Sequence, residues 1–328
     1  MNERERFLKT MRFETPDRVP YFEQYIREDT VERWHNEGLP PGVDIEEYFN
    51  LDHREVIPLK LSYREMDKRF DYPIENERDL ERFRTFLADA RRRAYPRNWK
   101  SLVKRYRDRD YPVGIGAWES GVLLFLGVID WPTFERACYL ICDNPRLVKS
   151  IIETAANYLM QGIEPALNEV DIDFAYFSEP IAGSNGPVIS PQMFREFALP
   201  HYRKMAAFLR ERGVNIIILR SFGNIEALLP DMVDAGVNGL WLTETVPSNM
   251  DYLSIRRQYG KRLALIGGID SNVLMRDEEA IKEEIYRKVP SLLETGGYIP
   301  TIDNRARAHI PFKNFVYYRQ LLEELCGK

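Results

Sequence analysis

The chain has 328 residues, of which 44% are hydrophobic and 30% are charged, and its formal net charge at pH 7 is −5. This composition can bury a sizeable core, is not that of a disordered chain, and gives no electrostatic reason to expect nucleic acid as a partner. The longest apolar run, 121–129, is well short of the ~20 residues that a membrane helix needs, which predicts no membrane span. The charged start of the sequence lacks the apolar segment of a signal peptide, so we expect a cytoplasmic protein.

The first half of the sequence predicts few strands. Its expected elements are a polar helix over 1–17, a strand over 18–25, a weak strand over 54–61, a strand over 111–118, and a helical region over 132–170 with a break at Asn144-Pro145. Residues 42–110 contain a strongly charged helical stretch. Acids interrupt its basic run, which favours a solvated outer helix over an RNA-binding face.

From residue 171 onward one pattern occurs five times: an apolar run that ends on a polar or charged residue, followed by a loop and a helix. Apolar runs without polar alternation are typical of strands covered on both faces, as in parallel sheets under crossover helices. The expected strand ends are Glu179, Arg220, Glu244, Asp270 and Asp303. If these strands lie parallel in a (β/α)8 barrel, their ends gather at the face where such barrels place their chemistry.

The domain organisation follows from the same pattern. No linker, low-complexity tract or short repeat interrupts the alternation of strands and helices. The sequence therefore predicts an α/β fold, a single TIM barrel over 1–328, with 1–17 as an N-terminal helical extension.

Arg220 needs an explanation, because it directly follows a run of buried-strand character. Its charge cannot be removed by proton loss, so it requires an anionic partner. It could bind a substrate carboxylate through two N–H groups, or form an internal ion pair with Glu179 or Asp303. Both interactions could also occur in sequence, the ion pair before the ligand binds and the substrate contact afterwards. Asn224, four residues later, could contact a ligand or cap a helix.

The acids at the expected strand ends are Glu179, Glu244, Asp270 and Asp303. Carboxylates crowded in a partly dry site raise one another's pKa, so one of them could act as a general acid near neutral pH. Some could instead be caps, since Asp270 precedes a segment where a helix could begin.

The segment after the last expected strand carries Arg305, Arg307 and His309. Two arginines and a histidine could surround an anion, and histidine is the side chain that titrates near neutral pH. The segment could equally be a solvated polar loop. Neither a pair of histidines or cysteines near a strand end nor a glycine-rich phosphate loop occurs, so the sequence predicts no bound metal and no nucleotide.

Several segments resemble the uroporphyrinogen decarboxylase superfamily, namely 183–205, 223–240, 259–270 and 296–303, with further likeness at 17–20 and 143–148. The resemblance implies a (β/α)8 barrel with its site at the C-terminal mouth, often as a homodimer. It implies one of two chemistries. One is metal-free and cofactor-free decarboxylation of the acetate arms of a tetrapyrrole, with arginines holding carboxylates. The other is methyl transfer between a methylated corrinoid and a thiol, in which zinc activates the sulfur.

The sequence departs from both patterns. The zinc-dependent methyltransferases carry a His-x-Cys pair before Gly-Asn, and the matching positions here are Arg220 and Phe222, which cannot ligate zinc. The decarboxylases carry Arg-Gln-Ala-Gly-Arg after the first strand, and the corresponding segment here, 24–29, keeps at most Arg27. The chain thus resembles a divergent member of the superfamily.

These observations predict a metal-independent enzyme without a cofactor that acts on an anionic, carboxylate-bearing small molecule by decarboxylation or a related proton-assisted step. The expected roles are carboxylate binding by Arg220, Arg27 and Arg305, proton donation or stabilisation by Glu179 or Asp303, a wall completed by Tyr176 and His309, and further ligand contacts from Asn224, Glu244 and Asp270.

Two alternatives stay open. The first is a corrinoid-dependent methyltransferase that moves a methyl group from a methylated corrinoid, on a corrinoid protein, or from a methoxylated donor to a folate or thiol. The second is a barrel that has lost its chemistry and serves as a binding subunit.

Overall fold

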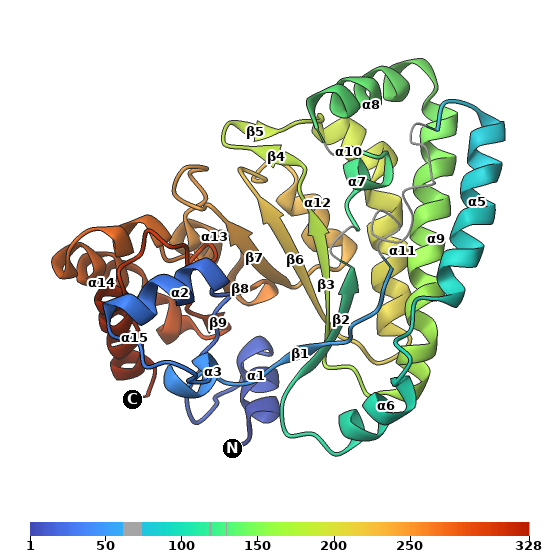
Figure 1. Ribbon diagram of the computed structural model, residues 1–328. Coiled ribbons are helices and arrows are strands. Elements are labelled where there is room, and N and C mark those ends of the chain that lie inside the picture. Colours follow the sequence, from blue (N-terminus) through green and yellow to red (C-terminus); the bar gives the residue numbers. More distant parts are fainter. Residues whose placement is uncertain (62–73, 118–119, 129, 328) are drawn as a thin grey trace.

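Seven parallel strands form one curled sheet in the computed structural model, which describes residues 1–61, 74–117, 120–128 and 130–327 (Figure 1). The strand order is β1 (Glu55–Val56), β2 (Val113–Ala117), β3 (Phe174–Glu179), β6 (Ile216–Phe222), β7 (Gly239–Thr243), β8 (Ala264–Ile266) and β9 (Tyr298–Ile299). Each strand is parallel to its neighbours, and the spatial order follows the chain. The predicted parallel α/β sheet is therefore confirmed. The end of the strand expected over 111–118, Trp118, lies outside the described residues.

The segment expected as the first strand lies between β9 and β1 but lacks a continuous ladder. Ile26 forms a single parallel bridge with Ala306, and the Asp52 N–H donates to the Tyr21 carbonyl at 2.9 Å. The Glu23 carbonyl accepts from Arg54 Nη2 at 2.5 Å, so a side chain takes an acceptor that a neighbouring strand could use. Over the described residues, the regular pairing of the sheet thus includes seven strands, whereas eight were expected.

Helices connect the strands and cover the outer face of the sheet (Figure 1). In chain order they are α1 (Glu3–Met11), α2 (Glu28–Glu37), α3 (Ile45–Tyr48), α5 (Glu77–Arg92), α6 (Trp99–Arg107), α7 (Val122–Phe125), α8 (Trp131–Asp143), α9 (Pro145–Glu169), α10 (Pro191–Phe197), α11 (Leu199–Arg210), α12 (Leu229–Ala235), α13 (Tyr252–Tyr259), α14 (Glu278–Thr295) and α15 (Phe312–Cys326), with 3-10 turns η1 (Gly260–Arg262) and η2 (Ser271–Met275). A short hairpin of β4 (Ala182–Gly183) and β5 (Gly186–Pro187) follows β3.

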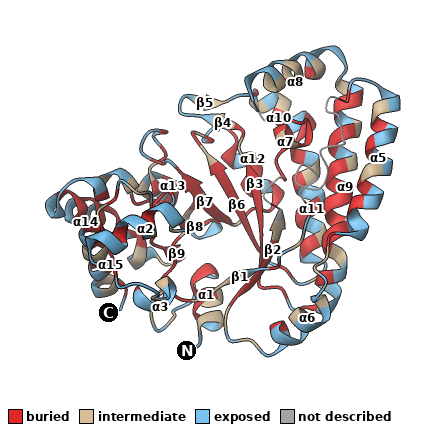
Figure 2. Cartoon of the chain, viewed as in Figure 1, coloured by how far each residue is buried: buried red, intermediate tan, exposed pale blue. Residues whose placement is uncertain are grey.

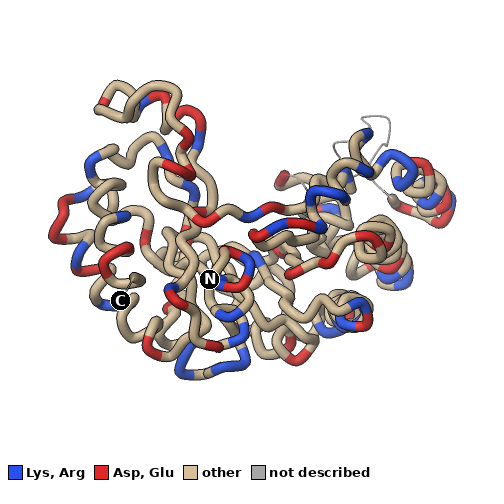
Figure 3. Tube along the Cα trace, turned by 90° about the horizontal axis from the view of Figure 1, so that it is seen from below, with Lys and Arg blue, Asp and Glu red and all other residues tan. Residues whose placement is uncertain are grey.

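The charged stretch within 42–110 forms two helices, α5 and α6, and the apolar stripe of α5 is buried while most of its charged residues stay exposed (Figure 2). Figure 3 shows Lys and Arg interleaved with Asp and Glu along the outer helices. The predicted solvated outer helix is therefore confirmed, but it is divided into two helices. Within the described residues, no helix is long and apolar enough to cross a membrane.

The predicted break in the helical region over 132–170 occurs where expected. Asn144 ends α8 and caps α9, with its side-chain oxygen accepting from the Leu147 N–H at 3.2 Å. Pro145 occupies the first turn of α9, where the missing N–H has no helical partner to lose.

The inner face of the sheet has its own apolar cluster, separate from the larger core under the helices. Side chains alternate along a strand, so Phe174 and Tyr176 of β3 face inward while Ala175 and Phe177 face the helices. Helix α1 adds Phe7 and Met11 to the inner cluster, and the Arg4 N–H donates to the Asp110 carbonyl just before β2. The predicted N-terminal helix therefore fills the end of the curled sheet where the strands begin.

Candidate active site

A cavity of about 190 Å³ lies within the inner face of the sheet, bounded by α1. We call it the central cavity. Its apolar lining consists of Phe7, Phe22, Val56, Phe174, Ile218 and Ile266. Its polar lining consists of Gln24, Arg54, Tyr176, Arg220 and Trp241. Largely apolar cavities with a few polar groups are typical of small-molecule sites.

Two arginines share the central cavity. Arg220, on β6, is 6% exposed, and Arg54 directly precedes β1. Loss of hydration lowers the pKa of each guanidinium to about 10, and the charges of Arg305 and Arg54 contribute to the lowering at Arg220. Within the described part of the chain, no carboxylate forms an ion pair with Arg54. Two guanidiniums that line one poorly hydrated cavity make it favourable for an anionic group.

Trp241 lies against both guanidiniums. The Cζ atoms of Arg220 and Arg54 are 5.4 Å and 5.5 Å from its ring centroid, and Arg54 Cζ is 4.5 Å from the Phe22 ring. Trp241 Nε1 and Gln24 Oε1 are buried without a hydrogen-bond partner among the described residues. Buried polar atoms are normally paired, so these two atoms are available to a ligand.

Tyr176 lines the central cavity together with Arg220, as the predicted wall residue. Burial raises the pKa of its phenol, and the positive charge of Arg220 opposes part of that rise. The hydroxyl therefore stays protonated at neutral pH and can donate a hydrogen bond or a proton inside the cavity.

Glu179 does not line the central cavity, because the alternation that turns Tyr176 inward turns Glu179 toward the helices. It is fully buried and accepts hydrogen bonds from the Val122 N–H at 3.1 Å and the Tyr202 hydroxyl at 2.6 Å. Burial raises its pKa to about 7. Glu179 can thus titrate near neutral pH, but on the outer side of β3.

Asp303 is buried and holds loops together. Its carboxylate accepts from the Thr245 N–H at 2.8 Å, the Thr245 hydroxyl at 2.9 Å and the Ser271 N–H at 3.0 Å. These bonds join the segments that follow β7, β8 and β9. Neither Asp303 nor Glu179 forms the internal ion pair with Arg220 that the sequence left open.

A second cavity, of about 260 Å³, opens beyond the ends of β7, β8 and β9, and we call it the mouth pocket. Four predicted site residues line it, namely Glu244, Asp303, Arg305 and His309, together with Arg307. Glu244 is 3.6 Å from Arg307 in an exposed ion pair. Arg305 lines the mouth pocket, and its positive charge contributes to the lowered pKa of Arg220 in the central cavity.

Three predicted ligand contacts have local partners and line neither cavity. Asn224 Oδ1 accepts from the Glu226 N–H at 3.0 Å and stabilises the turn before α12. Asp270 Oδ1 accepts from the Asn272 N–H at 2.9 Å and begins η2. Asp270 thus fits the capping interpretation, whereas α12 has Leu228 at its N-cap and no side-chain cap, so Asn224 does not cap that helix. Arg27 is exposed and pairs with Asp29 at 2.8 Å.

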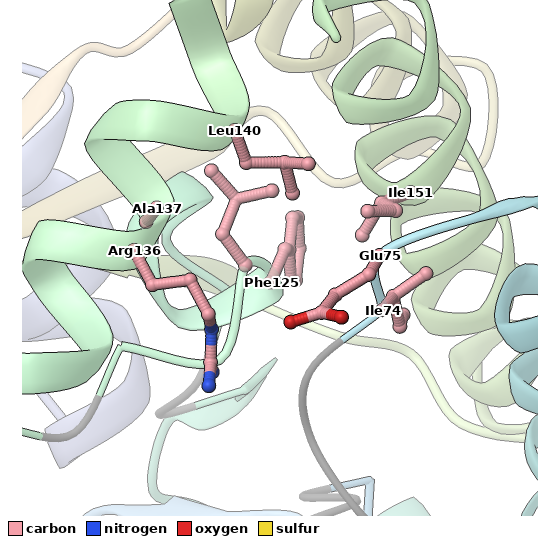
Figure 4. A pocket seen from close by; sticks show the side chains of 8 residues that line it. Ile74, Glu75, Phe125, Arg136, Ala137, Leu140 and Ile151 are labelled. Carbon is pink, nitrogen blue, oxygen red and sulfur yellow. The ribbon is translucent and has the colours of Figure 1, made fainter. Parts of the chain in front are cut away.

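A further cavity lies between α7, α8 and α9, outside the sheet (Figure 4). Its lining is mostly aliphatic, with Arg136 and Glu75 at its edge. At about 20 Å³ it has room for little more than one water molecule, so we assign no ligand to it.

Residues 58–303 match the family model described as uroporphyrinogen decarboxylase (URO-D). The chain belongs to this family. Among curated URO-D proteins, it is 24% identical to that of Chloroherpeton thalassium over 238 residues, covering 69% of this chain and 63% of the relative. It is 27% identical to that of Pseudomonas fluorescens over 170 residues, covering 51% of this chain and 45% of the relative. The aligned region thus spans about half to two thirds of these relatives.

A solved structure described as a methyltransferase from Methanosarcina mazei has the same fold. Its TM-score is 0.61 at 18% identity, with 98% of this chain and 99% of that chain covered. The URO-D family and this fold agree with the resemblance noted in the sequence.

Zinc does not fit the residues at the end of β6 in this URO-D member. Arg220 and Phe222 occupy the two positions where the resemblance implies a His-x-Cys pair, and neither side chain offers a lone pair to the metal. Among the residues that the structure describes, no cluster of three His, Cys, Asp or Glu side chains could hold a metal ion.

Sequence reasoning missed three polar residues of the central cavity, namely Gln24, Arg54 and Trp241. Arg54 and Val56 are two apart in the weak strand and share its inner face. Trp241 and Thr243 have the same relation on β7. The alternation of side chains along each strand shows which residues share a face. It does not show which face is the inner one until the neighbouring strands are known.

Proposed function

We propose that this URO-D family member binds a carboxylate-bearing small molecule in the central cavity and acts on it, without a metal, by decarboxylation or a related proton-assisted step. The supporting observation is that Arg54 and Arg220 line one mostly apolar cavity. Buried guanidiniums are stabilised by an anion that makes two-point hydrogen bonds, as a carboxylate does.

The polar residues have different proposed roles. Arg54 and Arg220 bind and orient a carboxylate, and the apolar walls exclude water around the bond that breaks. In a decarboxylation the carbon–carboxylate bond breaks, CO2 leaves, and the electron pair left on carbon takes a proton. Among the described residues that line this cavity, Tyr176 is the hydroxyl donor, whereas Glu179 and Asp303 accept hydrogen bonds elsewhere.

The test is a calorimetric titration of the purified protein with small carboxylic acids, before and after removal of metals with a chelator. We expect binding that Arg220→Met and Arg54→Met each weaken and that chelation leaves unchanged. Arg27→Met is the matched control, because Arg27 is exposed and lines neither cavity. Unchanged affinity in Arg220→Met, or loss of binding on chelation, would contradict the proposal.

Methyl transfer from a methylated corrinoid is the second candidate. It is favoured by the similarity of nearly the whole fold to a methyltransferase structure. Arg220 and Phe222 argue against the zinc-thiol route, which leaves an acceptor such as a folate. A change in the visible spectrum of methylcobalamin on mixing with the protein would favour this candidate over decarboxylation.

A further inference from the structure

The central cavity combines two cations with a hydrocarbon surface. Six of its eleven lining residues have hydrocarbon side chains. A ligand that is polar throughout, such as a short dicarboxylate, would pair with the arginines but leave its remaining polar groups against hydrocarbon. Burying a polar group without a hydrogen bond is unfavourable, so this cavity favours an anion with one charged group and an apolar body.

The size of the cavity limits that body. At about 190 Å³ it is slightly larger than the ~150 Å³ apolar cavity known to hold a benzene molecule. Aromatic rings line it on more than one side, with Phe7, Phe174 and Trp241 from three different elements. An aromatic ring with a short carboxylate-bearing arm fits the volume of the central cavity and can pack against the aromatic side chains that line it.

One wall comes from outside the sheet. Phe7, on α1, is 1% exposed, and its ring centroid lies 5.1 Å from that of Phe174 and 5.9 Å from that of Phe22. Figure 1 shows α1 at the end of the sheet where the strands begin. Close-packed rings of this kind have little room to move, so the Phe7 ring fixes the extent of the cavity toward α1.

We propose that the ligand of the central cavity is a monocarboxylate with an apolar, ring-sized body, and that Phe7 sets the length of the body that fits. The inference rests on the proposed function, because it takes a carboxylate bound by Arg54 and Arg220 as its starting point. The Trp241 Nε1–H is a further donor for that carboxylate. Phe7 is then a specificity-determining residue supplied by the N-terminal helix.

Calorimetric titration of the full chain with two sets of acids tests the proposal. The first set is benzoate, phenylacetate, 3-phenylpropionate and 4-phenylbutyrate, and the second is succinate, glutarate and adipate. We expect the aryl acids to bind more tightly than the dicarboxylates. Affinity should rise roughly fourfold per added methylene until the body reaches Phe7, and then fall.

Phe7→Ala should move the optimum to a longer aryl acid. Met11→Ala is the matched control, because Met11 belongs to the same inner cluster and the same helix but does not line the cavity. It should keep the wild-type optimum. If Phe7→Ala does not fold, Phe7→Leu should show a smaller shift in the same direction.

The outcomes separate the two proposals. Binding that depends on Arg220 but prefers dicarboxylates, or whose length optimum is the same in wild type and the Phe7 variants, overturns this inference alone. If no acid of either set binds, both this inference and the proposed function are overturned.

Discussion

Glu179 gives a prediction about stability that depends on pH. Its carboxyl is fully buried, and burial raises its pKa from 4.5 to about 7. Between these two pH values the folded protein holds a proton on Glu179 that the unfolded chain has released. The unfolded state then binds fewer protons, so the free energy of unfolding falls as pH rises through this window. At 1.36 kcal/mol per pKa unit, the loss over the window is about 3 kcal/mol.

Glu179→Gln removes the titration while keeping the shape of the side chain. We expect the free energy of unfolding of the Gln variant, relative to wild type, to increase by about 3 kcal/mol from pH 4.5 to pH 7, and to be flat on either side. Urea unfolding at a series of pH values measures it, and the comparison cancels the titration of all other groups. A difference that does not vary with pH refutes the reasoning.

Tyr202→Phe provides an independent arm of the same experiment. The Tyr202 hydroxyl donates to Glu179 at 2.6 Å and opposes the rise of the Glu179 pKa. Without this donor the pKa should rise further, so the window of falling stability should extend above pH 7. A window that ends at a lower pH in Tyr202→Phe would show that the hydroxyl does not stabilise the carboxylate.

Further predictions concern the arginines, a buried ion pair and a glycine. Arg220→Met should weaken carboxylate binding about tenfold or more by calorimetry, since a hydrogen bond to a charged group contributes roughly 1.5–3 kcal/mol, while Arg27→Met should leave the affinity unchanged. Glu23→Ala should lower the free energy of unfolding in urea by roughly 3–5 kcal/mol, because it leaves the buried Arg319 without the partner it has at 3.0 Å, and a loss under 1 kcal/mol would contradict this. Gly268→Ala should destabilise by more than about 1 kcal/mol, because φ is +86° and an added Cβ would lie 2.5 Å from the Tyr252 ring. Gly213→Ala also has a positive φ but open space around it, so it isolates the backbone contribution.

Hydrophobic pattern alone predicted the strands of the second half. Of the expected strand ends, Glu179 is the last residue of β3, and Arg220 lies within β6. β8 and β9 are shorter than expected. Gly267 and Gly268 have φ of +100° and +86°, which interrupts β8, and Pro300 after β9 has no N–H for a ladder. The pairing resumes only as an isolated bridge between Ile269 and Ile302.

The composition of the site was harder to predict, because it depends on which face of each strand is inward. Of the site residues predicted from the sequence, Arg220 and Tyr176 line the central cavity, and the mouth pocket is lined by Glu244, Asp303, Arg305 and His309. The sequence could not identify Arg54, since its strand has only two residues in the ladder and the strand that pairs with it, β2, is 58 positions away in the chain. Capping was foreseen as an alternative for both Asn224 and Asp270. It is confirmed for Asp270, which begins η2, whereas Asn224 stabilises a turn and does not cap α12.

Which face of its strand a side chain occupies determines whether it can act on a ligand in the central cavity. On β3 and β6, Ser178 pairs with Arg220 and Glu179 pairs with Ser221, so the arginine and the acid lie on opposite faces of adjacent strands. The acid whose pKa is about 7 therefore cannot pass its proton to a ligand held by Arg220. Proton transfer in the central cavity should then depend on Tyr176 or on the ligand itself. Consequently Glu179→Gln should change the pH dependence of stability but leave carboxylate affinity as in wild type. Tyr176→Phe should weaken carboxylate binding and leave the pH dependence of stability unchanged, because the Tyr176 hydroxyl stays protonated.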